Sequence, residues 1–494
     1  PSLRPSGCWT QPACDIIDIN GTATAMKDYK SDFEESIMLS YFGRLAYNYN
    51  KKYLTEFTIR RDGSSVFGEN VRWATFPSVA VGWAFSEESF MDRFWWLSYG
   101  KIRASWGKQG KAFRDPYLAQ GTLKASNSFM GVMGVVPTTM LASDLTWEES
   151  DQYDIGLDVD LFDYRIKLKL DYYYKYSSSL LQLVELPGNV YYHTQALQNV
   201  LEISNEGLEL EALADIFRDG PFTWRARFNI SRNWSRFEKS NTGMDLGTVV
   251  IGRPVYGVYA YNDLGIIESE EDIPVFVDRW GNKNPLSSGS PTQPFVPGLR
   301  MIEDVDGNGR INEDDMVYVD SALPIAHGGI ASELTWKGFD LNFSWAYQLG
   351  RHMYNTLPGS SIIPNYNGLE HPVLMDVRNV TFWEQPGDNS DYAKLQADSQ
   401  MQFFPNEMSV IDRYVEKVNW LKLKTVTLGY DLPRFLIRNW KIEQLRLFVS
   451  GENLLTFSNY SGIDPEIVDI RTGIDSGRNY PLARKFTIGL TLKF

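Results

Sequence analysis

Long stretches of the chain alternate between apolar and polar side chains. From residue 164 to residue 176 every even position is apolar or aromatic, and every odd position except Tyr173 is charged. Residues 222–230 and 339–347 show a similar alternation. Because successive side chains of a β-strand point to opposite faces of a sheet, these segments predict strands with one apolar and one polar face.

The predicted strands are long. Strands of soluble proteins typically have about 5–6 residues, whereas most of these run to about 9–14 residues, the length that a tilted strand needs to cross a bilayer. The sequence therefore predicts an all-β fold, an antiparallel transmembrane β-barrel, with about 13 strands in this chain. The predicted strands are 36–48, 53–61, 73–86, 97–108, 150–162, 164–176, 203–214, 222–236, 329–336, 339–349, 417–430, 442–451 and 484–494.

Aromatic side chains make up 14% of the 494 residues, and many lie at one end of successive predicted strands. Transmembrane barrels carry such residues as girdles at the membrane interfaces. Core packing would explain any one of them, but their recurrence at the strand ends favours a girdle. The residues are Trp95, Trp96, Phe162, Tyr164, Phe217, Phe222, Phe339, Phe435 and Trp440.

Short and long connections alternate between the predicted strands. Outer-membrane barrels have short periplasmic turns and long extracellular loops. On this basis residues 36–494 are assigned to the barrel, Phe494 lies on the periplasmic side, and residues 1–35 form an extracellular segment. The short connections are 49–52, 87–96, 163, 215–221, 337–338 and 431–441, and the long ones are 62–72, 109–149, 177–202, 237–328, 350–416 and 452–483.

The number of strands predicts that the chain cannot close a barrel alone. A bacterial barrel has an even number of strands and leaves no unpaired edge in lipid. Thirteen strands that begin outside the cell therefore require further strands from an upstream polypeptide. The final strand, residues 486–494, alternates strictly and ends on Phe494, which is similar to the signal read by the outer-membrane barrel assembly machinery.

Short segments along most of the chain resemble the SusC/RagA-like TonB-dependent outer-membrane transporters of Bacteroidetes. The resemblance implies a 22-stranded barrel with an N-terminal plug, a SusD-like lipoprotein on its outer face, and energy coupling to the TonB complex. The plug, the TonB-contacting segment and the first barrel strands have no counterpart here. The matching segments are 42–45 (FGRL), 61–68 (RDGSSVFG), 76–78 (FPS), 82–83 (GW), 101–107 (KIRASWG), 145–148 (LTWE), 152–157 (QYDIGL), 203–207 (ISNEG), 337–341 (KGFDL), 421–424 (LKLK), 428–430 (LGY), 452–454 (ENL) and 460–466 (YSGIDPE).

Residues 304–315 match the twelve-residue calcium loop. Oxygen-bearing side chains occupy loop positions 1, 3, 5, 9 and 12, a glycine stands at position 6, and position 7 supplies its backbone carbonyl. Position 12 is aspartate instead of glutamate, so its reach is shorter. The pattern predicts a structural Ca²⁺ site in an extracellular loop, and the alternative is a solvated acidic turn. The predicted ligands are Asp304, Asp306, Asn308, Arg310, Asn312 and Asp315.

Composition excludes several other functions. The net charge of −14 argues against a nucleic-acid partner, and no run of about 18 apolar residues predicts a membrane-spanning helix. No catalytic motif occurs, so we do not expect an enzyme; the paired acidic residues 148–149, 271–272 and 314–315 are interpreted as solvated charge or metal ligands. Cys8 and Cys14 form either a small disulfide loop or two free thiols.

The sequence thus predicts active import of a large nutrient, an oligosaccharide or an oligopeptide, across the outer membrane. The alternatives are a secreted, calcium-stabilised carbohydrate-binding or adhesive β-protein, and a siderophore or cobalamin receptor of the same barrel type. Loop aromatic residues could stack on sugar rings or pack the long loops together, and packing is favoured. These residues are Tyr256, Tyr259, Trp280, Tyr354, Tyr366 and Trp383.

Overall fold

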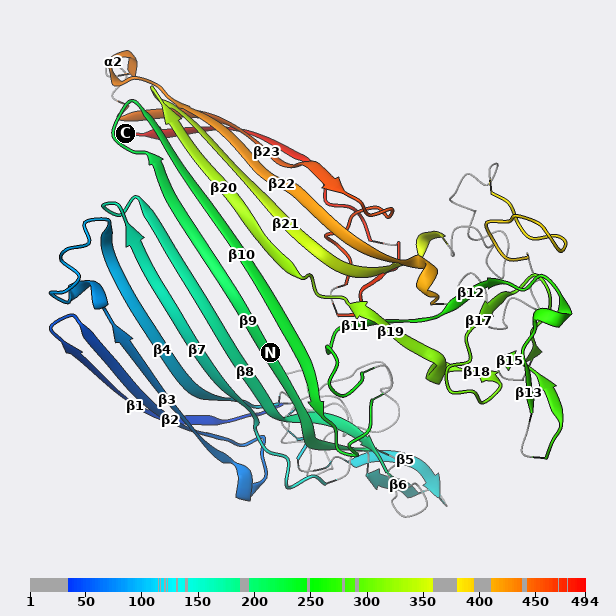
Figure 1. Cartoon of the computed structure of the whole chain (residues 1–494). Coiled ribbons are helices and arrows are strands. Elements are labelled where there is room, and N and C mark those ends of the chain that lie inside the picture. Colours follow the sequence, from blue (N-terminus) through cyan, green and yellow to red (C-terminus); the bar gives the residue numbers. More distant parts are fainter. Residues whose placement is uncertain are drawn as a thin grey trace, which may run out of the picture.

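The structure, a computed structural model, consists of one large curved sheet with a smaller loop domain beyond one end of its strands (Figure 1). It describes residues 34–494 except 114, 116, 120, 122, 130–131, 138–140, 187–194, 247–248, 278–279, 289–292, 359–379, 395–409, 438–441, 470 and 478. Cys8, Cys14 and most of the predicted extracellular segment 1–35 lie outside these residues, and so do Tyr366 and Trp440.

The main sheet is an antiparallel meander. In the described residues thirteen strands pair in chain order, each with its neighbours along the chain, and a fourteenth two-residue strand, β24 (Ile474–Asp475), pairs in parallel with β21. The predicted all-β, antiparallel class is confirmed, and each of the thirteen predicted strands coincides with one strand of the meander. They are β1 (Met38–Tyr49), β2 (Tyr53–Ser64), β3 (Trp73–Trp83), β4 (Leu97–Lys111), β7 (Glu148–Leu161), β8 (Ile166–Glu185), β9 (Gln195–Phe217), β10 (Phe222–Lys239), β20 (Ala326–Trp336), β21 (Phe339–Asn355), β22 (Val415–Asp431), β23 (Gln444–Ser458) and β25 (Lys485–Lys493).

The pairing register sorts the side chains into two faces. Leu170 of β8 lies opposite Leu157 and Leu210, so apolar residues form continuous rows across neighbouring strands. The adjacent Lys169 lies opposite Asp158 and Glu211, in the polar rows. Ion pairs cross the polar face from strand to strand, including Arg44–Glu56, Arg103–Asp158, Arg227–Glu333 and Arg446–Asp340. A one-residue slip of any strand would exchange the two faces, so this register is strongly specified.

The strands are longer than predicted at the end that carries the long loops. β8 continues to Glu185, β9 begins at Gln195, and β21 and β23 continue to Asn355 and Ser458. The predicted loop 177–202 is therefore largely paired strand. Alternation marks only the part of a strand that needs an apolar face, whereas backbone pairing continues beyond that part.

The short connections are tight turns, and aromatic residues surround them. Phe162, Asp163 and Tyr164 all have positive φ, so Tyr164 belongs to a turn, not to the strand that was predicted to begin there. Lys337 and Gly338, also at positive φ, form the two-residue turn between β20 and β21. Girdle residues contact one another at this end: the ring pairs are Trp95–Phe162, Phe217–Phe222 and Phe339–Tyr430.

The long connections contain a domain with its own core. Buried residues of 258–322, of the end of β21 and of 392–414 pack together, among them Tyr261, Ile302, Tyr354 and Ile411. The short strands of this domain are β11 (Gly257–Tyr261), β12 (Asp263–Ile266), β13 (Val275–Val277), β14 (Lys283–Pro285), β15 (Ser287–Ser288), β16 (Gln293–Pro294), β17 (Arg300–Ile302), β18 (Arg310–Ile311) and β19 (Met316–Ser321).

Other elements are few in the described residues. β5 (Leu123–Phe129) and β6 (Val132–Pro137) form a separate hairpin. The helices are the single turn α2 (Arg434–Ile437) and short 3-10 turns at Glu69–Val71, Phe85–Glu87, Glu270–Asp272, Glu313–Asp315 and Asp412–Tyr414. None of the helices in the described part of the chain has the length and apolar character needed to span a membrane.

The meander stops at two open edges. β1 pairs only with β2, and β25 pairs only with β23, in the described part of the chain. Large apolar side chains on both edge strands are exposed, for example Phe42 (79% exposed) and Ile488 (84%). The sheet curves strongly between these edges without closing (Figure 1).

The two faces can be tested by placing arginine on each. Leu168→Arg should impair assembly, because an arginine at mid-bilayer on the lipid face costs roughly 2–4 kcal/mol. Lys169→Arg keeps the charge beside Glu211 and should be tolerated. Heat-modifiable electrophoretic mobility of the full-length protein measures assembly, and equal behaviour of the two variants would contradict the face assignment.

Candidate functional site

The acidic loop of the loop domain brings three carboxylates together. One oxygen from each of Asp304, Asp306 and Asp315 lies within 4.8 Å of the others. Asp315 is completely buried, whereas Asp306 is exposed. The loop lies between β17 and β19, and Asp315 ends a 3-10 turn that leads directly into β19. Three of the six predicted ligands therefore converge.

Backbone N–H groups organise these carboxylates. Asp304 Oδ1 accepts from Gly307 and Asn308 at 2.9 and 3.2 Å, and its Oδ2 accepts from Gly309 at 2.8 Å. Asp315 Oδ1 accepts from Val305, also at 2.8 Å. Gly307 has φ +71°, a conformation that glycine adopts without strain. The chain therefore folds round the carboxylates as a tight turn.

The remaining predicted ligands lie in the same loop with other contacts. Asn308 Oδ1 accepts from the Arg310 N–H at 2.7 Å, and Asn312 Oδ1 accepts from the Asp314 N–H, also at 2.7 Å. Arg310 belongs to β18, which pairs in parallel with β15. All the predicted ligand atoms are oxygens. Oxygen ligands suit a hard cation such as Ca²⁺, whereas a thiophilic metal prefers sulfur ligands.

The acidic loop adjoins the core of the loop domain. Burial, together with the charges of Glu313, Asp315 and Asp314, raises the pKa of Tyr261 to about 12. Tyr261 pairs with Met316 at the start of β19, immediately after the acidic loop. An interaction that stabilises the acidic loop therefore also stabilises the core around Tyr261.

The predicted aromatic residues lie in different environments. Tyr354 and Trp383 are buried; Tyr354 packs edge-on against Tyr414, and Trp383 donates to Glu268 at 3.3 Å. Tyr256 packs against the core of the loop domain, and Tyr259 is half-buried edge-on against Tyr318. Trp280, in contrast, is 72% exposed. The packing interpretation therefore suits Tyr354 and Trp383 best, and Trp280 is the most exposed of the described residues in this set.

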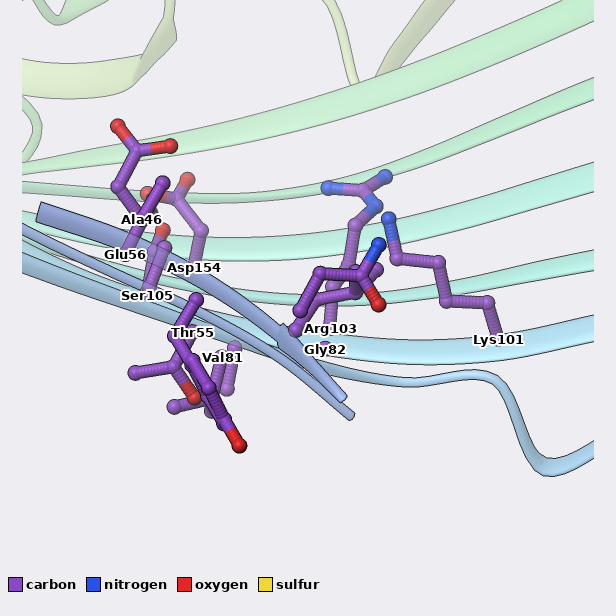
Figure 2. A pocket seen from close by; sticks show the side chains of 14 residues that line it. Ala46, Thr55, Glu56, Val81, Gly82, Lys101, Arg103, Ser105 and Asp154 are labelled. Atoms are coloured by element: carbon purple, nitrogen blue, oxygen red, sulfur yellow. Dashed lines mark hydrogen bonds between the residues drawn. The ribbon is translucent and has the colours of Figure 1, made fainter. Parts of the chain in front are cut away.

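The polar face of the first strands holds a pocket of about 450 Å³ that sequence reasoning missed. Lys101, Arg103, Glu56 and Asp154 extend from one side of the strands, whereas Thr55 and Val81 extend from the other (Figure 2). Arg103 is held by Asp158 at 3.3 Å and by Asp171. The pocket thus presents fixed charges of both signs to the concave side of the sheet.

A buried ion cluster fastens the last long loop to the sheet. Lys422 of β22, 3% exposed, lies 3.0 Å from Asp464 and 2.9 Å from Glu466. Lys424 completes the cluster at 2.6 Å from Glu466. Nearby, the buried Arg351 donates to the carbonyls of Ala322 and Asp469, at 2.8 and 2.9 Å. Lys422, Lys424, Asp464 and Glu466 lie within segments that carried the family resemblance, but nothing in the sequence indicated that they pair.

Comparisons with known proteins agree with this fold. The family model described as TonB dependent receptor-like, beta-barrel matches residues 9–291. TonB-dependent receptor P3 of Formosa agariphila is 31% identical over 503 residues, covering 97% of this chain and 47% of that protein. TonB-dependent receptor SusC of Bacteroides thetaiotaomicron is 27% identical, covering 92% of the chain and 44% of that protein.

A solved structure of the RagAB peptide transporter superposes with a TM-score of 0.73 at 25% identity, covering 93% of this chain and 48% of the matched chain. The chain belongs to the TonB-dependent receptor β-barrel family, and the predicted resemblance to its SusC/RagA-like members is confirmed. It spans about half the length of each relative that it matches. Membership of this family favours the transporter over the secreted adhesive protein.

Substitution of Lys422 should release the last long loop. Lys422→Met removes the buried cation that neutralises Asp464 and Glu466, and breaking a buried ion pair in this way typically costs roughly 3–5 kcal/mol. Limited proteolysis of the full-length protein should then cut within residues 459–484. Lys485→Met is the matched control, because its pair with Glu452 is exposed and worth about 0–1 kcal/mol. Equal proteolysis of both variants would contradict a fastening role.

Proposed function

We propose that this chain is the C-terminal wall of a TonB-dependent transporter that imports a large nutrient across the outer membrane. The observation that carries the proposal is the thirteen-strand meander with two open edges, which superposes on about half of the RagAB peptide transporter. A membrane-spanning sheet must pair every backbone group, so β1 and β25 need strands from an upstream polypeptide. That polypeptide would also carry the plug and the TonB-contacting segment and complete the expected 22 strands.

The arrangement of turns and loops supports an orientation. The C-terminus lies beside α2 and the short turns, at the opposite end of the strands from the loop domain (Figure 1). Short turns are periplasmic in barrels of this kind. We therefore assign Phe494 to the periplasmic side and the loop domain to the cell surface, where a SusD-like lipoprotein would dock, with residues 1–35 also outside.

The cargo we propose is an oligopeptide or an oligosaccharide. Charges of both signs on the concave side, at Lys101, Arg103, Glu56 and Asp154, suit peptides with charged ends. The exposed Trp280 of the loop domain offers a ring face to either class. The solved relative RagAB is described as a peptide transporter, which supports the peptide.

Import is tested in cells that produce the full-length protein. Uptake of the nutrient should stop when TonB is deleted, because import against a gradient needs its energy. Mass spectrometry of protein purified from the outer membrane should identify a co-purified peptide or glycan. The same preparation should have an intact mass well above the 56.5 kDa of this chain. A closed barrel made of this chain alone, or uptake without TonB, would contradict the proposal.

We further propose that Asp304, Asp306, Asn308, Asn312, Asp315 and the Arg310 carbonyl bind a structural Ca²⁺. Such an ion would tie the acidic turn to the core of the loop domain and order the surface on which the lipoprotein docks. The oxygen donor set and the three converging carboxylates support this assignment. Extracellular calcium sites often bind with affinities on the order of 10⁻⁴–10⁻³ M, so occupancy should depend on the calcium of the medium.

Asp306→Ala should abolish the effect of calcium on the loop domain. In the wild-type full-length protein, millimolar calcium should slow proteolysis of residues 237–328 and chelation should restore it, because the ion offsets the repulsion among the carboxylates. Asp306→Ala should be cut rapidly under both conditions and bind the lipoprotein less tightly, with unchanged barrel assembly. Asp314→Ala, at a non-ligating loop position, is the control. If calcium does not change the proteolysis pattern of the wild type, the proposed site is only an acidic turn that binds no ion.

A further inference from the structure

An open apolar groove of about 670 Å³ lies on the outward face of the sheet, near the ends of five neighbouring strands, β10, β20, β21, β22 and β23. Its apolar side chains include Phe228, Ile330 and Leu349, which belong to the face that carries the apolar rows. The groove is therefore on the opposite side of the wall from the charged pocket of Figure 2, and the imported cargo does not pass it.

One row of the outward face crosses the groove and contains a glycine. Ile230, Gly328, Tyr347, Leu421 and Phe457 lie opposite one another in register across the five strands. Gly328 contributes no side chain, and the Tyr347 hydroxyl reaches past it to the Asn229 carbonyl at 2.9 Å. A Cβ at Gly328 would collide with that carbonyl, so the backbone there cannot carry a larger residue. The Tyr347 side chain thus fills the place that a side chain at Gly328 would take.

The groove lies at the level of the outer leaflet. Phe339, in the aromatic girdle, and Leu349, in the groove, are ten residues apart on β21. At about 3.3 Å per residue and a tilt of about 35–45°, that separation spans roughly 25 Å across the membrane, the height of the apolar band of an outer-membrane barrel. The groove is therefore one membrane thickness away from the periplasmic turns.

The outer rim of the groove is polar and tied together by hydrogen bonds. Asn419 accepts from the Gly350 N–H at 2.8 Å, and its own N–H donates to Asn459 Oδ1 at 2.7 Å. Asn459 Nδ2 donates in turn to the Lys417 carbonyl at 2.9 Å. The boundary between apolar wall and polar rim is thus a fixed part of the sheet.

A cation lies beyond the β10 side of the groove, on the same outward face. Arg232 is two residues beyond Ile230 on β10, and its guanidinium packs over the Trp234 ring at 4.6 Å. In the part of the chain that the structure describes, Arg232 forms no ion pair, unlike the paired arginines Arg225 and Arg227 of the polar face of β10. An exposed arginine at the outer interface, without a carboxylate, is complementary to an anionic headgroup.

We propose that this groove binds an outer-leaflet lipid with a phosphate-bearing headgroup. One acyl chain lies in the groove between Ile230 and Phe457, and Arg232 contacts the phosphate. The site faces the membrane, not the cargo, so it anchors the transporter to lipid. The inference rests on the proposed location in the outer membrane.

The test uses the full-length transporter, purified in mild detergent and analysed by native mass spectrometry with added dimyristoyl phosphatidylglycerol or phosphatidylcholine. The wild type should retain phosphatidylglycerol in preference to phosphatidylcholine. Arg232→Gln should reduce phosphatidylglycerol retention roughly fivefold, the effect of one basic residue at an anionic surface. It should reduce phosphatidylcholine retention less, because the choline cation already neutralises the phosphate of that lipid. Leu421→Trp, which fills the groove, should reduce retention of both lipids.

Leu170→Trp is the matched control, because Leu170 is an outward residue of β8 that does not line the groove. It should retain both lipids as the wild type does. Equal retention by the wild type, Arg232→Gln and Leu421→Trp would overturn the proposal. The proposal would also be overturned if the transporter were a dimer that Leu421→Trp dissociates, because the groove would then be occupied by a second copy of the protein. Heat-modifiable mobility separates these results from failure of the proposed function: an assembled barrel without retained lipid contradicts only the lipid site.

Discussion

The rest of the structure depends on the requirement that every backbone N–H and C=O group within the membrane be paired. In the described residues, each of the thirteen antiparallel strands pairs with a strand on both sides except β1 and β25. Those two edges carry exposed large apolar side chains, and in a hydrocarbon environment each would leave a column of unpaired backbone groups. The closed barrel that we propose therefore needs further strands along both edges.

Beyond the membrane, the same strands continue without the need for a lipid-facing side. The outer ends of β21 and β22 need no lipid face, and they support buried charge clusters and the core of the loop domain. Lys422 with Asp464 and Glu466, and Arg351 with two carbonyls, fix the loop after β23 against the sheet. A long barrel strand thus serves two purposes, as a membrane wall in its first half and as a scaffold for surface loops in its second.

The two faces of the wall have separate chemistry. The concave face balances its charges across strands, as with Arg103 between Asp158 and Asp171, and so presents fixed charges of both signs. The outward face is apolar except near its rims, where aromatic rings and Arg232 mark the boundaries with water. Because neighbouring residues of one strand belong to different faces, a single register determines the chemistry of both faces.

The sequence by itself determined the strands, their faces and the acidic loop. Residues such as Leu168 and Lys169 alternate in polarity because successive side chains of a strand point to opposite faces, one toward lipid and one toward water. The residues of a calcium loop are contiguous in the chain. Only the tertiary structure decided that Lys422 lies beside Asp464, that Tyr354 and Trp383 are buried, and that Ile330, Leu349 and Phe457 line one groove. Each of these depends on residues distant in sequence that are brought together by cross-strand register and loop packing, about which local periodicity carries no information.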